Sequence, residues 1–237
     1  PSGSRIAGTI ATADGQGVNN VTVSFDANAP EYPKSEQTVA SGSFDMKDNP
    51  NYLDYVVSAS KGGDYLNGVS TLDLVMIQRH ILGLQALDNN YKWIAADANN
   101  DGNVTANDLT ALRKLILGVS STLPNNQQRW RFPVAGTTVT TSPIKFDEAI
   151  EIDNLSADMA NQNFVGVKVG DVNGNVSTNA NTDNVESRSN SGVEMTVAES
   201  EVAAGAVVEI PVTAGQFAEV SGFQYTMNLN GASFVGI

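Results

Sequence analysis

The feature that most constrains this chain is an internal repeat, in which two similar segments stand 35 residues apart. Six identities relate the two copies: Val69, Asp73, Leu74, Ile81, Leu82 and Gly83 correspond to Val104, Asp108, Leu109, Ile116, Leu117 and Gly118. Self-similarity at such a period is typical of a supersecondary unit that buries its apolar face against a neighbouring copy. The sequence therefore predicts two copies of one unit that pack together.

Each copy carries the signals of one short helix. Apolar residues recur at helical spacing at Leu74, Ile77 and Ile81 and again at Leu109, Leu112 and Ile116. A hydroxyl residue followed three positions later by an aspartate, Ser70 with Asp73 and Thr105 with Asp108, marks the start of each helix. The glycine at the end of each copy marks the stop. We therefore expect a two-helix module.

Residues 97–108 have the ligand pattern of a twelve-residue calcium loop. The oxygen donors fall at positions 1, 3, 5, 7, 9 and 12, and they are Asp97, Asn99, Asp101, the Asn103 carbonyl, Thr105 and Asp108. Gly102 at position 6 permits the sharp turn. Three carboxylates so close together would repel one another without a cation. The alternative is a solvated turn in which Thr105 and Asp108 only cap the helix.

The corresponding loop of the first copy is shortened. Counted back from the aspartate that closes it, position 5 falls on Leu66, which cannot bind a metal ion. Candidate oxygen ligands remain at Asp64, Asn67, Ser70 and Asp73. A bound calcium ion and a metal-free capping turn are both compatible with this sequence.

A later segment, Gly170-Asp-Val-Asn-Gly174, is similar to the front half of a calcium loop but has no helix after it. If the strand expected at residues 164–169 returns beside the first helix, Asp171 and Asn173 would supply the ligands that the first copy lacks. The alternative, and the commoner role of Asp-x-Asn-Gly, is a turn that closes a strand.

Composition excludes several classes of function. The chain has 26 acidic and 13 basic residues, which gives a net charge of −13, so we expect no binding to nucleic acid or to an anionic membrane surface. Its longest apolar runs are far below the ~18–20 residues that span a bilayer, so we expect no insertion into membranes. It has no cysteine and one histidine, His80, which excludes thiolate metal sites and histidine pairs. We expect no enzymatic activity, because the acidic residues fall in the loops or are scattered, and His80 lies among apolar helix residues.

The segments around the repeat read as β-structure. Short alternating stretches separated by turns fill residues 5–60, and Phe164-Val-Gly-Val-Lys-Val169 is a further strand. The pattern Ile6-x-Gly8-x-Ile10, Val21-x-Val23, Gly42-x-Phe44 and Tyr55-x-Val57 resembles the carboxypeptidase-regulatory-like and CnaB-like families. The resemblance implies a β-sandwich that serves as a spacer on secreted proteins.

The repeat itself resembles the type I dockerin family over residues 62–120. The resemblance implies calcium at the second loop, with the family ligands at the six donors given above. It also implies a cohesin as partner, bound through loop positions 10 and 11 and the adjoining helix faces. Those positions are Thr71, Leu72, Ala106 and Asn107, which differ from the small hydroxyl pair common in cellulosomal members.

The C-terminal part resembles the opening strands of a cohesin-type domain, through Val208-Glu-Ile-Pro-Val212, Gly222–Leu229 and Phe234–Ile237. We expect a fold that is mainly β with a small α insertion: a regulatory-like sandwich, a dockerin-like helical calcium module and a partial cohesin-like sandwich. The predicted parts are 1–61 with 126–176 for the sandwich, 62–125 for the helical module, 177–192 for a linker and 193–237 for the last domain. A chain that starts at Pro1 and ends within a strand is expected to be a processed or excised piece.

This order of modules resembles surface proteins exported by Bacteroidetes-type bacteria. The expected function is that of a non-catalytic, calcium-stabilised modular protein outside the cell or on its surface, as an adhesin, a stalk or a filament subunit. One alternative is a dockerin–cohesin type docking module, whose partner is another protein domain or a further copy of the chain. Another is an accessory region of a secreted polysaccharide-degrading enzyme. Because extracellular calcium is near millimolar, a site with a Kd of ~10⁻⁴ M would be filled there.

Overall fold

The computed structural model describes residues 3–63, 65–125, 127–179, 194–197, 206–207, 209 and 211–215. The chain divides into two compact units, Pro1–Asn184 and Val185–Ile237. The division falls inside the linker predicted at 177–192, but residues 177–179 pack against the first unit, where the Thr178 carbonyl accepts a hydrogen bond from the Asn19 N–H.

The larger sheet of the first unit has four antiparallel strands in the order β3-β2-β5-β9. Their bounds are β2 Thr22–Ala27, β3 Lys34–Gln37, β5 Tyr55–Ser60 and β9 Ala149–Ile152. Buried and more exposed side chains alternate along these strands, as expected for strands with one face on a core. On β2, Val23 and Phe25 are buried while their neighbours are not, and Tyr55 and Val57 repeat the pattern on β5.

The second sheet has three strands in the order β10-β1-β4. Their bounds are β1 Ser4–Ala11, β4 Ser43–Asn49 and β10 Phe164–Val165. The strand β4 pairs antiparallel with β1, and β10 pairs parallel with it. Since β9 and β10 follow the helices in sequence, the chain returns to both sheets after the helical segment.

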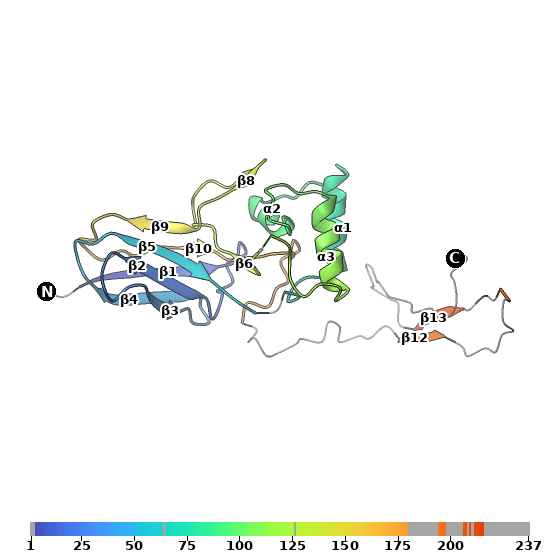
Figure 1. Ribbon diagram of the computed structural model, residues 1–237, viewed down its shortest axis with the longest axis horizontal. Coiled ribbons are helices and arrows are strands. Elements are labelled where there is room, and N and C mark those ends of the chain that lie inside the picture. Colours follow the sequence, from blue (N-terminus) through green and yellow to red (C-terminus); the bar gives the residue numbers. More distant parts are fainter. Residues whose placement is uncertain are drawn as a thin grey trace. The chain divides into compact units, whose positions relative to one another are not determined.

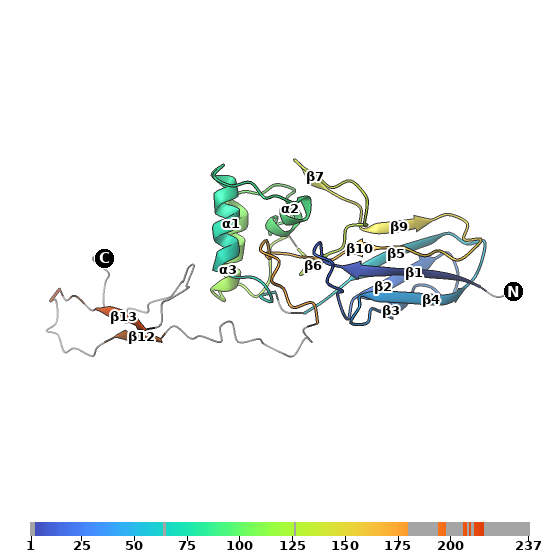
Figure 2. The same cartoon turned by 180° about the vertical axis from the view of Figure 1, so that it is seen from behind.

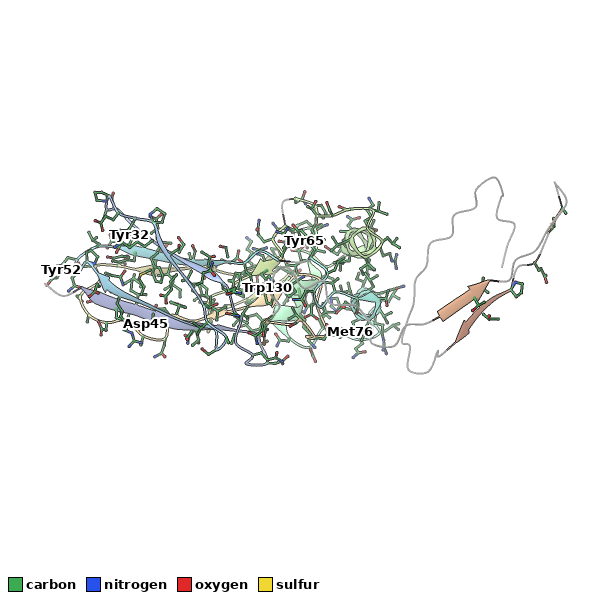
Figure 3. All side chains as sticks on the ribbon, turned by 90° about the horizontal axis from the view of Figure 1, so that it is seen from below. Tyr32, Asp45, Tyr52, Tyr65, Met76 and Trp130 are labelled. Carbon is green, nitrogen blue, oxygen red and sulfur yellow. The ribbon has the colours of Figure 1, made fainter. Side chains whose placement is uncertain are left out.

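The two sheets face each other across one hydrophobic core. Ile6 and Ile10 from β1 and Phe44 from β4 meet Phe25 and Tyr55 from the larger sheet, and all five side chains are at most 2% exposed. Figure 3 labels Tyr32 and Tyr52 toward one end of this part and Trp130 near the helices. Burial of these large side chains is the main stabilising contribution to the β part.

Three helices gather at one end of the two sheets (Figures 1 and 2). Their bounds are α1 Thr71–Ile81, α2 Asn90–Ala96 and α3 Ala106–Ile116. The helices α1 and α3 pack together, and Ile77 and Leu112, which occupy equivalent positions of the repeat, are both fully buried. The third helix, α2, differs from the predicted two-helix module: it is one short element of seven residues without an amphipathic period.

The helices have a core of their own, which is completed by residues of the returning chain. Val167, Val169 and Val172 pack into it after the last helix has ended. Four short strands frame this return: β6 Trp130–Arg131, β7 Thr140–Thr141, β8 Ile144–Lys145 and β11 Val167–Lys168. The pairs are β11 with β6 and β7 with β8. The strand expected at 164–169 is thus divided between β10 and β11.

The second unit contains an antiparallel pair, β12 Glu194–Val197 with β13 Val212–Gly215. The segments Gly222–Leu229 and Phe234–Ile237, on which the predicted cohesin-like domain also depends, lie outside the described residues. In the described part of both units, the structure has no helix with the length and apolar character needed to cross a bilayer.

Candidate metal centre

The loop at residues 97–108 begins where α2 ends. The Asn89 side chain accepts a hydrogen bond from the Tyr91 N–H at 2.8 Å and caps the start of α2, and Asp97 occupies the C-terminal cap. The last three residues of α2, Ile94, Ala95 and Ala96, are buried, so the helix ends with Asp97 inside the protein. Asp97 is consequently 4% exposed, unusual for a carboxylate.

Backbone N–H groups converge on the Asp97 carboxylate. Its Oδ1 accepts from the Asp101 N–H at 3.0 Å and its Oδ2 from the Gly102 N–H at 2.9 Å. The Asn99 Oδ1 accepts from the same Asp101 N–H at 3.0 Å. Gly102 has a φ of +82°, and its carbonyl accepts from the Ile144 N–H at 2.7 Å. The loop backbone therefore wraps around the Asp97 carboxylate.

Asp108 closes the loop from the first turn of α3. It is fully buried, its Oδ2 accepts from the Thr105 N–H at 2.7 Å, and its Oδ1 accepts from the Asn99 N–H at 3.1 Å. Thr105 in turn caps α3 by accepting from the Asn107 N–H at 3.2 Å. This is the predicted capping box, and it fixes the closing carboxylate against the front of the loop.

Three side chains from outside the repeat bind the loop, two at backbone carbonyls and one at a side chain. The Gln127 Nε2 donates to the Asp97 carbonyl and the Asn125 Nδ2 to the Asn99 carbonyl, both at 2.7 Å. The Arg131 Nη1 donates to the Asn100 Oδ1 at 2.8 Å. Sequence reasoning missed these residues, because single polar residues in an irregular segment carry no periodic signal that points to a distant loop.

The surroundings of the loop disfavour the ionised form of its buried aspartates. Burial, the largest cause, raises the pKa of Asp97 and of Asp108 above the usual range. The charge of Asp101 raises both further, and hydrogen bonds from the backbone partly oppose the shifts. Within the described residues, no ion pair joins a lysine or arginine to any of these three carboxylates.

The residues fit a hard cation with oxygen ligands, but the carboxylates alone do not make up a full set of ligands for it. The Asp101 carboxylate accepts hydrogen bonds from the Asn103 N–H at 2.9 Å and from the Asn99 Nδ2 at 2.8 Å. In the part of the chain that the structure describes, no three side chains of the His, Cys, Asp and Glu types gather as a metal-binding group. The fit depends on a mixed set of carboxylate, amide, hydroxyl and carbonyl oxygens around two buried, unpaired carboxylates.

The closing acid of the first copy, Asp73, has the same environment as Asp108. It is fully buried at the start of α1, and its Oδ2 accepts from both the N–H and the hydroxyl of Ser70 at 2.8 Å. The Asn67 side chain pairs with the backbone of Ser177, donating to its carbonyl at 2.9 Å and accepting from its N–H at 3.1 Å. Asp64, the remaining candidate of this copy, lies outside the described residues.

The structure brings the segment 171–173 against α1. The Asp73 Oδ1 accepts from the N–H groups of Val172 and Asn173 at 2.9 and 3.1 Å. Burial raises the pKa of Asp73 and of Asp171, and the charge of Asp73 raises that of Asp171 further. Two buried carboxylates from distant parts of the chain thus lie close enough to repel.

The four candidate protein-binding residues lie at the starts of α1 and α3. Ala106 and Asn107 are exposed, Leu72 is 39% exposed, and Thr71 is partly exposed. Further apolar side chains are exposed on or just after the same two helices, namely Val75, Leu82, Leu84, Leu117 and Val119. His80 packs its ring edge-to-face on Trp93 with centroids 4.4 Å apart, and burial lowers its pKa.

Residues 67–117 match the family model of the dockerin type I domain. The match takes in the three helices of the described residues, both capping boxes and the complete loop at 97–108. Comparisons with curated proteins and with solved structures found no match. This segment, on its repeat and its loop geometry, is therefore similar to a calcium-binding docking domain of the dockerin type I family.

Proposed function

We propose that residues 67–117 form a calcium-stabilised module that docks another protein domain. One observation carries the proposal: the segment that matches the dockerin type I domain contains two helices of one repeat, each begun by a fully buried aspartate. Burying an unpaired carboxylate is costly unless a partner charge compensates it. A calcium ion is the partner that this donor set favours.

In the second loop the ligands are Asp97, Asn99, Asp101, the Asn103 carbonyl, Thr105 and Asp108. A bound calcium ion would supply positive charge between the end of α2 and the start of α3. The backbone N–H groups orient the Asp97 carboxylate, and the capping box holds that of Asp108. Gln127 and Asn125 position the loop carbonyls from outside. These residues fix the angle at which α3 leaves the loop.

The proposed docking surface is the exposed face of α1 and α3, and it includes Thr71 and Leu72 at the start of α1 and Ala106 and Asn107 at the start of α3. Exposed leucine and valine side chains on two copies of one unit suit a flat apolar partner surface. The proposed partner is a cohesin-type domain. Because these four residues differ from the usual hydroxyl pair, we expect selectivity for a partner other than those of cellulosomal dockerins.

We further propose an extracellular or cell-surface location and a non-catalytic role, as a stalk, an adhesin or a filament subunit. The two-sheet unit that carries the helices supports the regulatory-like assignment, and the buried acids support the absence of catalysis. Backbone N–H groups hold the carboxylates of Asp73 and Asp108, which suits a structural role better than proton transfer. An accessory region of a secreted polysaccharide-degrading enzyme is the alternative.

The test is binding of the immobilised full chain to a panel of purified cohesin domains, with calcium and with a chelator. The proposal predicts calcium-dependent binding to at least one member, lost in Leu72→Asp and retained in Val39→Asp, an exposed control on the β part. If no member binds, or if binding persists in chelator, the docking proposal is wrong. Light scattering with calcium tests the filament role, which requires assembly at high concentration.

A further inference from the structure

The segment 171–176 reproduces the hydrogen bonds of the calcium loop at 97–102. The Asp171 Oδ1 accepts from the N–H four residues later, that of Asn175 at 3.2 Å, as Asp97 does from Asp101 at 3.0 Å. The Asp171 Oδ2 accepts from the N–H five residues later at 2.9 Å, as Asp97 does from Gly102. The segment is therefore folded as the front half of a calcium loop, although no helix follows it.

The next donor also has its counterpart. The Asn173 Oδ1 accepts from the Asn175 N–H at 3.0 Å, as Asn99 does from Asp101. The spacing Asp171-x-Asn173-x-Asn175 therefore places oxygen donors at loop positions 1, 3 and 5. Asn175 was missed by sequence reasoning, although this spacing was visible in the sequence.

The back half of this loop comes from the first copy of the repeat, about one hundred residues earlier. The Asn173 N–H donates to the Asp73 Oδ1 at 3.1 Å, as the Asn99 N–H does to Asp108 at 3.1 Å. The Ser70 N–H donates to the Asp73 Oδ2, as the Thr105 N–H donates to the Asp108 Oδ2. The repeat spacing of 35 residues places the Gly68 carbonyl at the position of the Asn103 carbonyl.

We propose that residues 171–175 and 68–73 form one discontinuous calcium site. Its ligands are Asp171, Asn173, Asn175, the Gly68 carbonyl, Ser70 and Asp73. The inference rests on the proposed calcium-stabilised module and extends it, because the shortened loop is completed by a segment outside the matched residues. Asn67, a candidate ligand from sequence, instead joins the two halves by its two hydrogen bonds to the Ser177 backbone.

Two observations besides the loop geometry point to a ligand. Asp73 and Asp171 are 0% and 7% exposed, and two buried negative charges that repel each other are costly unless a positive charge compensates them. Gly68 permits a close approach: a Cβ there would lie 2.8 Å from the Val176 Cα and 3.0 Å from the Asp171 Oδ2. The two halves are thus in direct contact around two buried carboxylates.

The composite site has a smaller charge than the continuous one. Its side-chain ligands include two carboxylates, Asp73 and Asp171, while the loop at 97–108 has three. Since calcium affinity rises with the charge of the ligands, we expect the composite site to be the weaker of the two. Occupancy would fasten the segment after β11 to the start of α1.

The experiment is a calorimetric titration of the full chain with calcium chloride. The wild type should take up two equivalents. Asp171→Ala should leave one, with the tighter affinity, and Asp97→Ala should leave the weaker one. Asn175→Ala removes an exposed side chain and keeps the backbone hydrogen bonds, so it should fold and weaken the second equivalent by at least about tenfold. Asp14→Asn is the matched control, because its carboxylate lies next to Gly174 without being a ligand, and it should leave both equivalents.

The outcomes separate the two proposals. If the wild type binds one equivalent that Asp97→Ala abolishes and that Asn175→Ala leaves unchanged, the composite site is refuted and the continuous site stands. If Asp97→Ala still binds one equivalent that Asn175→Ala weakens, the composite site is supported. If the wild type binds none, both proposals fail.

Discussion

At the scale of single residues, two glycines show how a shared backbone conformation can serve different ends. Gly68 and Gly83 have φ values of +77° and +69°, so both occupy the left-handed region. An added Cβ at Gly83 would meet nothing within 4 Å, whereas at Gly68 it would press on the Val176 backbone. Gly83 serves only the end of α1, while Gly68 also lets two distant segments touch.

Replacement of each glycine by alanine should therefore have unequal effects. Gly83→Ala should lower the free energy of unfolding by about 1 kcal/mol, because its only cost is the left-handed conformation. Gly68→Ala should cost more and should also weaken the second calcium equivalent. Urea unfolding and calorimetry of both variants measure this, and equal losses with unchanged calcium binding would contradict the close approach.

The buried carboxylates predict an unusual pH dependence for the calcium-free protein. The pKa values of Asp73, Asp97, Asp108 and Asp171 are raised in the folded state, mainly by burial. A raised folded-state pKa stabilises the fold below the unfolded pKa, and this stability is lost as the pH rises through the folded value. In calcium-free buffer, the free energy of unfolding should thus increase as the pH is lowered from neutral toward the unfolded pKa of about 4.

Calcium should reverse this trend, because protons compete with calcium for the same carboxylates. Urea unfolding at several pH values, with and without calcium, gives the two slopes. Asp97→Asn removes one titrating group and should flatten the calcium-free slope. Parallel slopes with and without calcium would show that these carboxylates do not bind it.

At the scale of elements, the starts of α1 and α3 combine a helix cap with a metal ligand. The Thr105 hydroxyl accepts from the Asn107 N–H and is also the proposed ligand at loop position 9. In calcium-free buffer, Thr105→Ala should cost about 1 kcal/mol, the usual effect of losing a cap. With calcium the loss should be larger, and Thr105→Ser should restore most of it. Thermal unfolding under both conditions checks this, and an equal loss in both would exclude Thr105 as a ligand.

The elements also show what sequence can and cannot predict here. The capping pairs Ser70–Asp73 and Thr105–Asp108 locate α1 and α3 closely, because their signals are local. The helix α2 escaped prediction, since its seven residues bury a contiguous Ile94-Ala-Ala96 rather than a periodic face. Sequence could not predict the hydrogen bonds that Gln127 and Arg131 donate to the loop, or the contact of Asp73 with segment 171–173. These contacts depend on tertiary structure. For Asp171 and Asn173 the sequence suggested the partner but left the turn as an alternative.

At the scale of the whole molecule, the residues proposed to bind calcium all belong to the first compact unit. That unit has one core between its sheets and another among its helices, and Val167 and Val169 complete the second. A chain ending at Asn184 should therefore fold and bind the same number of calcium equivalents as residues 1–237. Calorimetry of the shortened chain tests this, and a lost equivalent would mean that residues 185–237 contribute to a site.

The central claim, that calcium holds the helical module together, is tested most directly by thermal unfolding of the full chain in millimolar calcium and in chelator, followed by helical circular dichroism. At one hundred times Kd, one site stabilises the fold by about 2.7 kcal/mol. For a unit of this size that raises Tm by about 5–10 °C per site. The account predicts a higher Tm in calcium, by this amount once calcium reaches one hundred times the Kd. The same Tm in calcium and in chelator would contradict it.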